Sequence, residues 1–346
     1  MADNLIYGKS VRDFGAVGDG NSDDTKAFTD AFSSGETLIS VPYGKYTVNA
    51  PLEIGGGVKI ECHKKAEINF KGIKTAKDAG EVRIRGGIWH CTDKKRAAFD
   101  FCGASCCVIE QISVSTESDA AVILSDCSEM TVDNVRFTKS IGASALVFDK
   151  KAEYCFVSGA DFTECDSGIN FTGGSEVKHV YFSGIRSDSC KNIIKATGAG
   201  LFDVRFTGVS GNAHEYAALI EKCSAGTVIV RDISVHDGYF KLSGNNIKEK
   251  IEISDFRRLC DLEKSESEPS LEVSSQACSV ICDGVALDAV ILAKKSIPDI
   301  KMTAARMASP LSSFKYTFEA DITEKERFIL PTGGFESLEI TGCSKD

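Results

Sequence analysis

One short pattern of hydrophobic and polar positions, apolar-x-apolar-x-x-apolar-x-apolar, recurs nine times between Val82 and Leu287. Alternating Val, Ile and Phe residues of this kind are typical of half-buried β-strands. A second alternating segment follows about 15 residues later and ends, for example, at Phe101, Leu124 or Phe148. The nine copies are 23 to 29 residues apart, and their anchor positions are Ile84, Ile109, Val132, Val157, Phe182, Phe206, Val230, Ile253 and Cys282.

A repeat of this length that already contains two strands leaves no room for a helix, and it predicts a solenoid of stacked coils. We therefore expect an all-β fold, a single-stranded right-handed parallel β-helix solenoid, because crossovers between parallel strands are nearly always right-handed. Successive coils should lie about 4.8 Å apart, which is the spacing of neighbouring strands.

The segments on either side of the repeat predict caps, because a solenoid exposes its apolar core at both ends. Residues 1–36 should form an N-terminal cap with a helix, with Ser22 as the N-cap and Asp23 and Asp24 in the first turn. Residues 37–293 should form about ten coils, of which the first are irregular. Residues 294–346 should form a strand-rich C-terminal cap or an oligomer contact. One face of the predicted helix would carry Ala27, Phe28, Ala31 and Phe32.

The overall charge and the apolar runs exclude several classes of partner. The 346 residues carry a formal net charge of −10, and no basic cluster has interleaved aromatic residues, so nucleic acid is not an expected partner. No apolar run is long enough to cross a membrane, and no signal peptide is visible, so membrane insertion is not expected.

Fourteen cysteines would indicate disulfides in a small secreted protein, but this chain is neither small nor dominated by loops, and no pair of cysteines has C-x-x-C spacing. Free cysteine packs as a small hydrophobe, so we expect reduced, structural cysteines rather than disulfides or metal ligands. This usage indicates synthesis in a reducing compartment, the cytoplasm.

Residues 11–28, VRDFGAVGDGNSDDTKAF, resemble the opening of the pectin-lyase-like β-helix superfamily, and VPYGKYTV at residues 41–48 resembles the segment that follows it. The superfamily includes polygalacturonases, pectate lyases and phage tail-spikes. The resemblance implies the β-helix fold and a structural role for the acidic residues of the opening segment. The chain lacks the Gly-His-Gly and Arg-Ile-Lys motifs of polygalacturonases, so no catalytic residue is carried over from them.

Ionisable residues gather at equal distances after successive anchors, where stacked coils would bring them to one edge. Asp188 and Asn212 would lie one coil apart and Asp188 and His236 two, spacings that suit acid–base chemistry on a sugar. Tyr181 and Arg205, each one residue before an anchor, would lie side by side on the outer strand face. Polar ladders of this kind are also common as purely structural turns. The expected catalytic residues are Asp188, His214, Glu215, His236 and Asp237, and the expected substrate-binding residues are Glu164, Asp166, Lys191, Arg205, Tyr181 and Asn212.

These features predict a carbohydrate-active β-helix that binds and cleaves a polysaccharide, as a glycoside hydrolase or a polysaccharide lyase. The first alternative is a trimeric phage tail-spike or receptor-binding protein, for which glycan binding suffices. The second is a structural β-helix without catalysis. We expect no cofactor and no metal site; in a lyase, either Ca²⁺ or an Arg or Lys side chain such as Arg205 or Lys191 would neutralise a uronate carboxylate.

Overall fold

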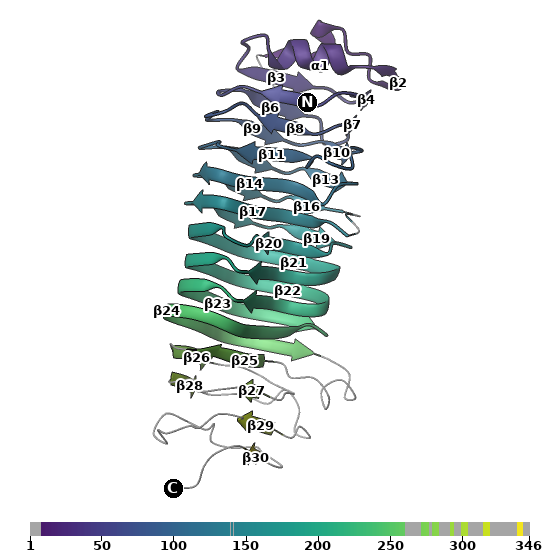
Figure 1. Ribbon diagram of the computed structural model, residues 1–346. Helices are drawn as coiled ribbons and strands as arrows, with labels where there is room; N and C mark the ends of the chain where they lie inside the picture. Colours follow the sequence, from purple (N-terminus) through teal and green to yellow (C-terminus); the bar gives the residue numbers. More distant parts are fainter. Residues whose placement is uncertain are drawn as a thin grey trace, which may run out of the picture. The chain divides into compact units, whose positions relative to one another are not determined.

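Parallel strands stacked in successive coils make up nearly all of the structure, which confirms the predicted all-β parallel β-helix (Figure 1). The computed structural model describes residues 8–138, 140 and 142–259 and six short strands beyond residue 259. The chain divides into two compact units, Met1–Asp166 and Ser167–Asp346, which we describe separately.

Most coils of the first unit contain three strands, one more than the sequence pattern required. Strands of equivalent position pair in parallel, so three ladders run along the unit. The unit opens with β1 (Lys9–Ser10), the 3-10 helix η1 (Val11–Phe14), β2 (Asp19–Asp23) and α1 (Thr25–Phe32). The three ladders comprise β3 (Leu38–Val41), β6 (Lys59–Cys62), β9 (Arg83–Arg85), β12 (Val108–Glu110), β15 (Thr131–Asp133) and β18 (Phe156–Ser158); β4 (Lys45–Thr47), β7 (Glu67–Phe70), β10 (Ile88–Cys91), β13 (Ser113–Thr116), β16 (Arg136–Phe137) and β19 (Asp161–Thr163); and β5 (Leu52–Ile54), β8 (Ile73–Thr75), β11 (Phe99–Cys102), β14 (Ala120–Ser128) and β17 (Ser144–Glu153).

The register of the first unit confirms the repeat residue by residue. Each anchor pairs with the next, from Ile84 through Ile109 and Val132 to Val157. The same ladder extends back to Ile60 and Ile39, so the coils predicted to be irregular are in register with the rest. Their pattern was hard to recognise because the bend between the first and second strand is longer in these coils than in the later ones. The second series is equally regular, with Phe101, Leu124 and Phe148 paired in turn.

The second unit continues the repeat with longer strands that pass through the bends of the coil. Its anchors also pair in order, from Phe182 through Phe206, Val230 and Ile253 to Cys282. Much of the segment predicted as a C-terminal cap lies outside the described residues, so its role stays a prediction. The strands are β20 (Ser167–Phe171), β21 (Glu176–Thr197), β22 (Gly200–Glu221), β23 (Ser224–His236), β24 (Tyr239–Leu259), β25 (Leu271–Gln276), β26 (Ser279–Asp283), β27 (Ile291–Ala293), β28 (Asp299–Thr303), β29 (Phe314–Phe318) and β30 (Leu338–Thr341).

A left-handed residue two positions after most anchors explains the two consecutive polar positions of the pattern. The backbone bends there between the first and second strand of each coil, and the bend requires a positive φ. Gly, Asn and Asp adopt this conformation most readily, which is why they recur at this position. The residues are Gly86, Gln111, Asn134 and Gly159 in the first unit and Gly184, Gly208 and Asp232 in the second.

The N-terminal helix forms as predicted but begins later than expected. Asp24, not Ser22, occupies the N-cap position, because residues up to Asp23 form β2, which pairs with β4. The buried carboxylate of Asp24 accepts hydrogen bonds from the Val17 and Gly18 amides, at 2.7 and 3.3 Å. The Asp24 side chain thus binds the preceding loop instead of capping the helix.

The predicted apolar face of α1 is buried as a whole, and it comprises Ala27, Phe28, Ala31 and Phe32. The Phe28 ring lies 5.5 Å from the ring of Tyr46 in β4, so the helix packs on the first coil. Its role as the cap of the solenoid stays a prediction. The helices in the described part of the chain are too short or too polar to span a membrane.

Large aromatic side chains fill the interior of the coils in the first unit. The ring of Trp89 is fully buried against Phe70 and Phe99, with centroids 5.3 and 5.4 Å away, and its indole N–H donates to the Gly86 carbonyl at 2.9 Å. The ten cysteines between Cys62 and Cys223 are all free thiols. Burial raises the pKa of the Cys107 and Cys223 thiols, which keeps them protonated and unreactive.

Candidate functional site

The predicted polar edge lies on strands β21 to β23 of the second unit. Asn212 pairs directly with His236, as the offsets predicted. Asp188 lies in a bulge, because the pairing shifts between Ser187 and Cys190. Two residues of β21 therefore face one position of β22 beside Gly211. A Cβ atom on Gly211 would lie 1.9 Å from the Ser187 carbonyl oxygen, so this bulge depends on glycine.

The side chains of this edge are polar and mostly exposed. Asp188 is exposed, and its Oδ1 accepts a hydrogen bond from the Ser189 hydroxyl at 3.1 Å. His214 and His236 are also exposed. The edge therefore presents a carboxylate and two imidazoles to solvent, the groups that acid–base chemistry requires.

An ion pair neutralises two further residues of the edge. Lys191 Nζ lies 3.1 Å from Glu215 Oε2, so the predicted substrate clamp binds a predicted catalytic acid of the next coil. Asp237 is half-buried and has a left-handed backbone. Glu164 and Asp166 belong to the first unit, where the Asp166 amide donates to the Ala143 carbonyl at 2.9 Å. Among the residues that the structure describes, no group of three or more His, Cys, Asp or Glu side chains could hold a metal ion.

The best-connected polar cluster of the second unit lies on the outer face of β21 and β22. Tyr181 and Arg205 pair in register, and the Arg205 guanidinium lies over the Tyr181 ring, 5.3 Å from its centroid. Asp203 Oδ2 accepts hydrogen bonds from His179 Nδ1 at 2.9 Å and from the Tyr181 hydroxyl at 2.7 Å. Asp203 Oδ1 accepts from Arg205 Nε at 2.8 Å. We call these four residues the tyrosine–arginine platform.

One carboxylate fixes the geometry of the tyrosine–arginine platform. Desolvation alone would raise the pKa of Asp203, but the hydrogen bonds from Tyr181, His179 and Arg205 outweigh it and lower the pKa to about 2. The hydrogen bond to Asp203 in turn raises the pKa of Arg205. Asp203 is therefore an anion at neutral pH. The Arg205 side chain, of which about half is exposed, holds its guanidinium over the tyrosine ring.

The sequence reasoning found Tyr181 and Arg205 but missed His179 and Asp203. A signal was present, because each lies three residues before an anchor, Phe182 or Phe206, so the register stacks one on the other. Both also have positive φ angles, 53° and 56°, which mark another bend of the coil. The sequence comparison considered mainly residues that follow the anchors, and this bend precedes them.

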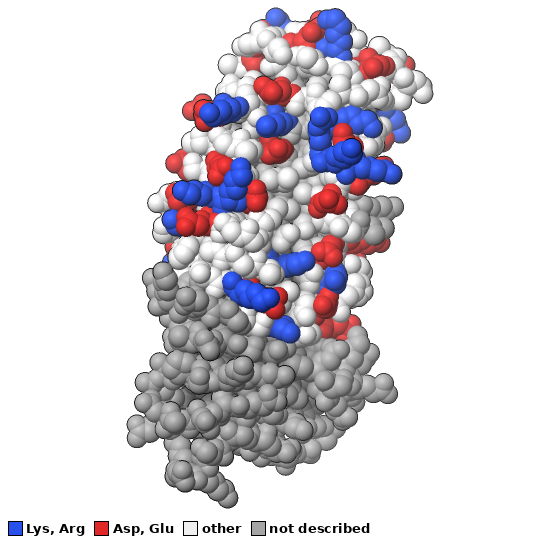
Figure 2. All heavy atoms as spheres, viewed as in Figure 1, with Lys and Arg blue, Asp and Glu red and all other residues white. Residues whose placement is uncertain are grey.

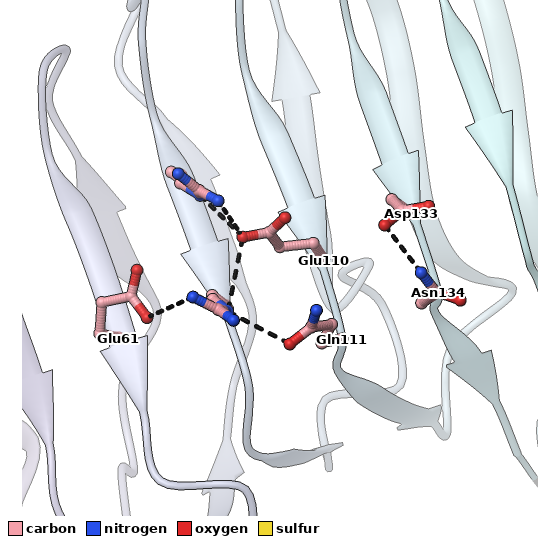
Figure 3. A network of polar contacts seen from close by, with 7 residues as sticks. Glu61, Glu110, Gln111, Asp133 and Asn134 are labelled. Carbon is pink, nitrogen blue, oxygen red and sulfur yellow. Dashed lines mark hydrogen bonds and ion pairs between the residues drawn. The ribbon is translucent and has the colours of Figure 1, made fainter. Parts of the chain in front are cut away.

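A second polar network lies on the outer face of β6, β9 and β12 in the first unit (Figure 3). Arg85 Nη1 lies 3.9 Å from Glu61, and its Nε lies 3.6 Å from Glu110 and 3.2 Å from Gln111 Oε1. Arg83 forms a further ion pair with Glu110. The carboxylates here bind neighbouring guanidinium groups, so this network connects adjacent coils rather than presenting free groups to a ligand.

Comparison with known proteins decides the family. Residues 9–194, more than half of the chain, match the family described as rhamnogalacturonase A/epimerase, pectate lyase-like. The chain belongs to this family. Membership confirms the resemblance to the pectin-lyase-like superfamily that the opening motif indicated. No curated protein sequence matches the chain.

Solved structures share the fold of this pectate lyase-like protein at low sequence identity. A surface adhesin of Streptococcus pneumoniae, PfbA, is 15% identical with a TM-score of 0.60, and the match covers 90% of this chain and 91% of the adhesin. An endo-xylogalacturonan hydrolase from Aspergillus tubingensis is 14% identical with a TM-score of 0.61, covering 93% and 98%. A tailspike protein mutant of E. coli bacteriophage HK620, in complex with a pentasaccharide, is 10% identical with a TM-score of 0.65, covering 96% and 78%. These similarities establish the fold alone.

The match to the pectate lyase-like family ends between the candidate residues. It includes His179, Tyr181 and Asp188 but stops before Asp203 and Arg205. The end of the matched region therefore falls between the two coils that build the tyrosine–arginine platform, with His179 and Tyr181 inside it and Asp203 and Arg205 beyond it. The function of the platform has to be argued from its own chemistry.

Proposed function

We propose that this pectate lyase-like protein binds a polysaccharide on the outer face of β21 and β22, at the tyrosine–arginine platform. The arrangement of Arg205 over Tyr181, fixed by Asp203, carries the proposal. A guanidinium donates hydrogen bonds to sugar hydroxyls, and a flat, preorganised surface limits the entropy lost when a ring binds. Two structural relatives act on or bind glycans, the endo-xylogalacturonan hydrolase and the tailspike with its pentasaccharide, which supports this ligand class.

The tyrosine–arginine platform suits binding better than proton transfer. A carboxyl group with a pKa of about 2 does not donate a proton at neutral pH, and it is too weak a base to remove one efficiently. Asp203 therefore positions its neighbours, and Arg205 and Tyr181 contact the ligand.

The decisive experiment compares two arginines that differ in their surroundings. Arg205→Ala should weaken binding of the tightest ligand in a glycan panel by about tenfold or more, since bound guanidinium groups contribute about 1.5–3 kcal/mol. Arg186→Ala is the matched control, because Arg186 is exposed on the same strand β21 and outside the platform. Binding would be measured by isothermal titration calorimetry. Equal affinity of Arg205→Ala and wild type, or no glycan bound at all, would refute the proposal.

Cleavage of the bound polysaccharide at the polar edge is the second candidate function. The pairing of Asn212 with His236 and the exposed position of Asp188 favour it, because they place acid and base within one or two strand spacings. Asp188 and Asp237 would be the acids, with His214, Glu215 and His236 beside them. A lyase would form unsaturated products, with Ca²⁺ or a cationic side chain neutralising the uronate carboxylate, and a hydrolase would form only new reducing ends.

Digestion of the glycan panel separates cleavage from binding. Asp188→Asn and Asp237→Asn should each abolish turnover while thermal unfolding stays nearly unchanged. If neither new absorbance of unsaturated uronates nor reducing ends form with the wild type, the edge is not catalytic. A trimer in light scattering, combined with binding alone, would then favour the tail-spike alternative.

A further inference from the structure

A second exposed patch, in the first unit, has the opposite charge to the chain as a whole. The bend between β10 and β11 has the sequence Thr-Asp-Lys-Lys-Arg, and Lys94, Lys95 and Arg96 are exposed. Figure 2 shows Lys and Arg side chains gathered beside strands β10 and β13, whereas acidic and basic side chains alternate elsewhere on this face. With Lys71 on the preceding coil, the bend carries four cations against one carboxylate, Asp93, in a chain with a formal net charge of −10. We call these four cations the basic bend.

The backbone of the basic bend is held in place by several contacts. Asp93 Oδ1 accepts a hydrogen bond from the Lys95 amide at 2.8 Å, and this bond lowers the pKa of Asp93. Lys71 Nζ donates to the Thr92 carbonyl at 3.3 Å, and the Cys91 thiol donates to the Arg96 carbonyl at 3.7 Å. The cations are therefore presented from a fixed turn rather than from a free loop.

The backbone at Gly72, next to Lys71, lies close to the backbone that follows Arg96. A Cβ atom on Gly72 would lie 2.7 Å from the Ala97 carbonyl oxygen, so Lys71 and the bend are immediate neighbours. Arg96 forms one ion pair, with Asp93 at 3.7 Å, and keeps 59% of its side chain exposed. Lys94 and Lys95 have no ion-pair partner among the described residues. Like charges at this density repel one another, and a polyvalent anion would relieve that repulsion.

We propose that the basic bend binds a polysaccharide that carries sulfate or phosphate esters, at a site separate from the tyrosine–arginine platform. Lysine ammonium groups act as point charges that suit tetrahedral oxyanions. The bend has no aromatic side chain on which a base could stack, which disfavours nucleic acid. It also has no large apolar side chain that could enter a lipid surface.

The acidic side chains of the next coil limit the size of this site. Glu117 and Asp119 follow β13 at the equivalent bend, so the basic surface spans two coils and not three. We therefore expect weak binding that depends strongly on salt. Ion pairs of exposed groups contribute little each and are screened at high ionic strength.

The test uses the whole protein and four fluorescent probes: dextran sulfate, polyphosphate, uncharged dextran and duplex DNA. We expect dextran sulfate, polyphosphate or both to bind at low salt, and uncharged dextran not to bind. Which of the two anions binds more tightly distinguishes sulfate from phosphate esters. The double variant K94E/K95E should weaken binding by about tenfold or more, since two attractive pairs of up to about 1 kcal/mol each become repulsive.

The matched control is K64E/K65E, which reverses another exposed Lys-Lys pair of the first unit. It lies before β7, whereas Lys71 follows that strand, so the two sites are separated by about 13 Å of strand. Equal loss in both double variants, or no loss in K94E/K95E, would overturn the proposal. Binding of DNA more tightly than of both anionic polymers would overturn it in favour of nucleic acid. Loss of glycan-panel binding in Arg205→Ala tests the platform alone, so the two proposals can fail separately.

Discussion

Replacement of Asp203 by Asn tests the electrostatics of the tyrosine–arginine platform directly. The substitution keeps the size of the side chain and one acceptor oxygen but removes the charge that His179, Tyr181 and Arg205 share. A fall of the pKa from 3.8 to about 2 corresponds to about 2 kcal/mol of folding free energy at neutral pH. Its partners are about half exposed, with 44% and 49% of the His179 and Arg205 side chains accessible, so solvent screening reduces the expected loss to about 1 kcal/mol.

The pH dependence of the Asp203→Asn effect distinguishes charge from shape. Because the folded-state pKa of Asp203 is lowered, its contribution is complete above the unfolded value of 3.8 and is lost as the pH falls towards 2. Urea unfolding followed by circular dichroism should therefore show the full difference from wild type at about pH 7 and at about pH 4.5, and a smaller one at about pH 2.5. The control Asp232→Asn removes the same charge from an exposed bend one coil further on. A loss that is constant with pH, or equal in the two variants, would refute the reasoning.

Three further predictions concern the core, the bulge and the cysteines. Phe206→Ala should lower the free energy of unfolding by about 3–5 kcal/mol, because the buried ring stacks on Phe182 at 4.6 Å; a loss below about 1 kcal/mol in urea unfolding would contradict this. Gly211→Ala should cost about 2 kcal/mol or more in the same assay, because the new Cβ would collide with a carbonyl oxygen, whereas Gly35→Ala has open space around it and should cost less. Fourteen thiols should react in denaturant without reductant, since the ten cysteines between Cys62 and Cys223 are free; a clearly smaller number would indicate disulfides.

The repeat could be predicted from sequence because one side-chain period sets both the strands and their stacking. A slip by one residue would move every apolar side chain to the outer face, so the anchors from Ile84 to Val157 could align in only one way. The early coils at Ile39 and Ile60 were harder to recognise, because three and four residues separate their first and second strands, against two residues in the later coils of this unit. The predicted helix start was wrong by two residues, because pairing of β2 with β4 overrode the local preference of Ser22 for the N-cap position.

The candidate site could be predicted only in part. The position of a residue relative to its anchor predicts which residues are neighbours on adjacent coils, but not which side chains form contacts. Register placed Asn212 beside His236 and Tyr181 beside Arg205. It could not show that Lys191 would bind Glu215, since long side chains choose among several partners one coil away. The bulge that contains Asp188 adds a residue to one strand, and no periodic count can locate such an insertion.

Because the register of the first unit is uniform, the solenoid can be lengthened or shortened by one whole coil at a time. Each coil offers the same edge to the coil before it and to the coil after it, with anchors such as Ile109 and Val132 in equivalent positions. Removal of the 23 residues from Ile109 to the residue before Val132 would join equivalent points and shorten the stack by one step of about 4.8 Å. Duplication or loss of single coils would thus change the length of the solenoid in steps of one coil, without a change in how its interior packs.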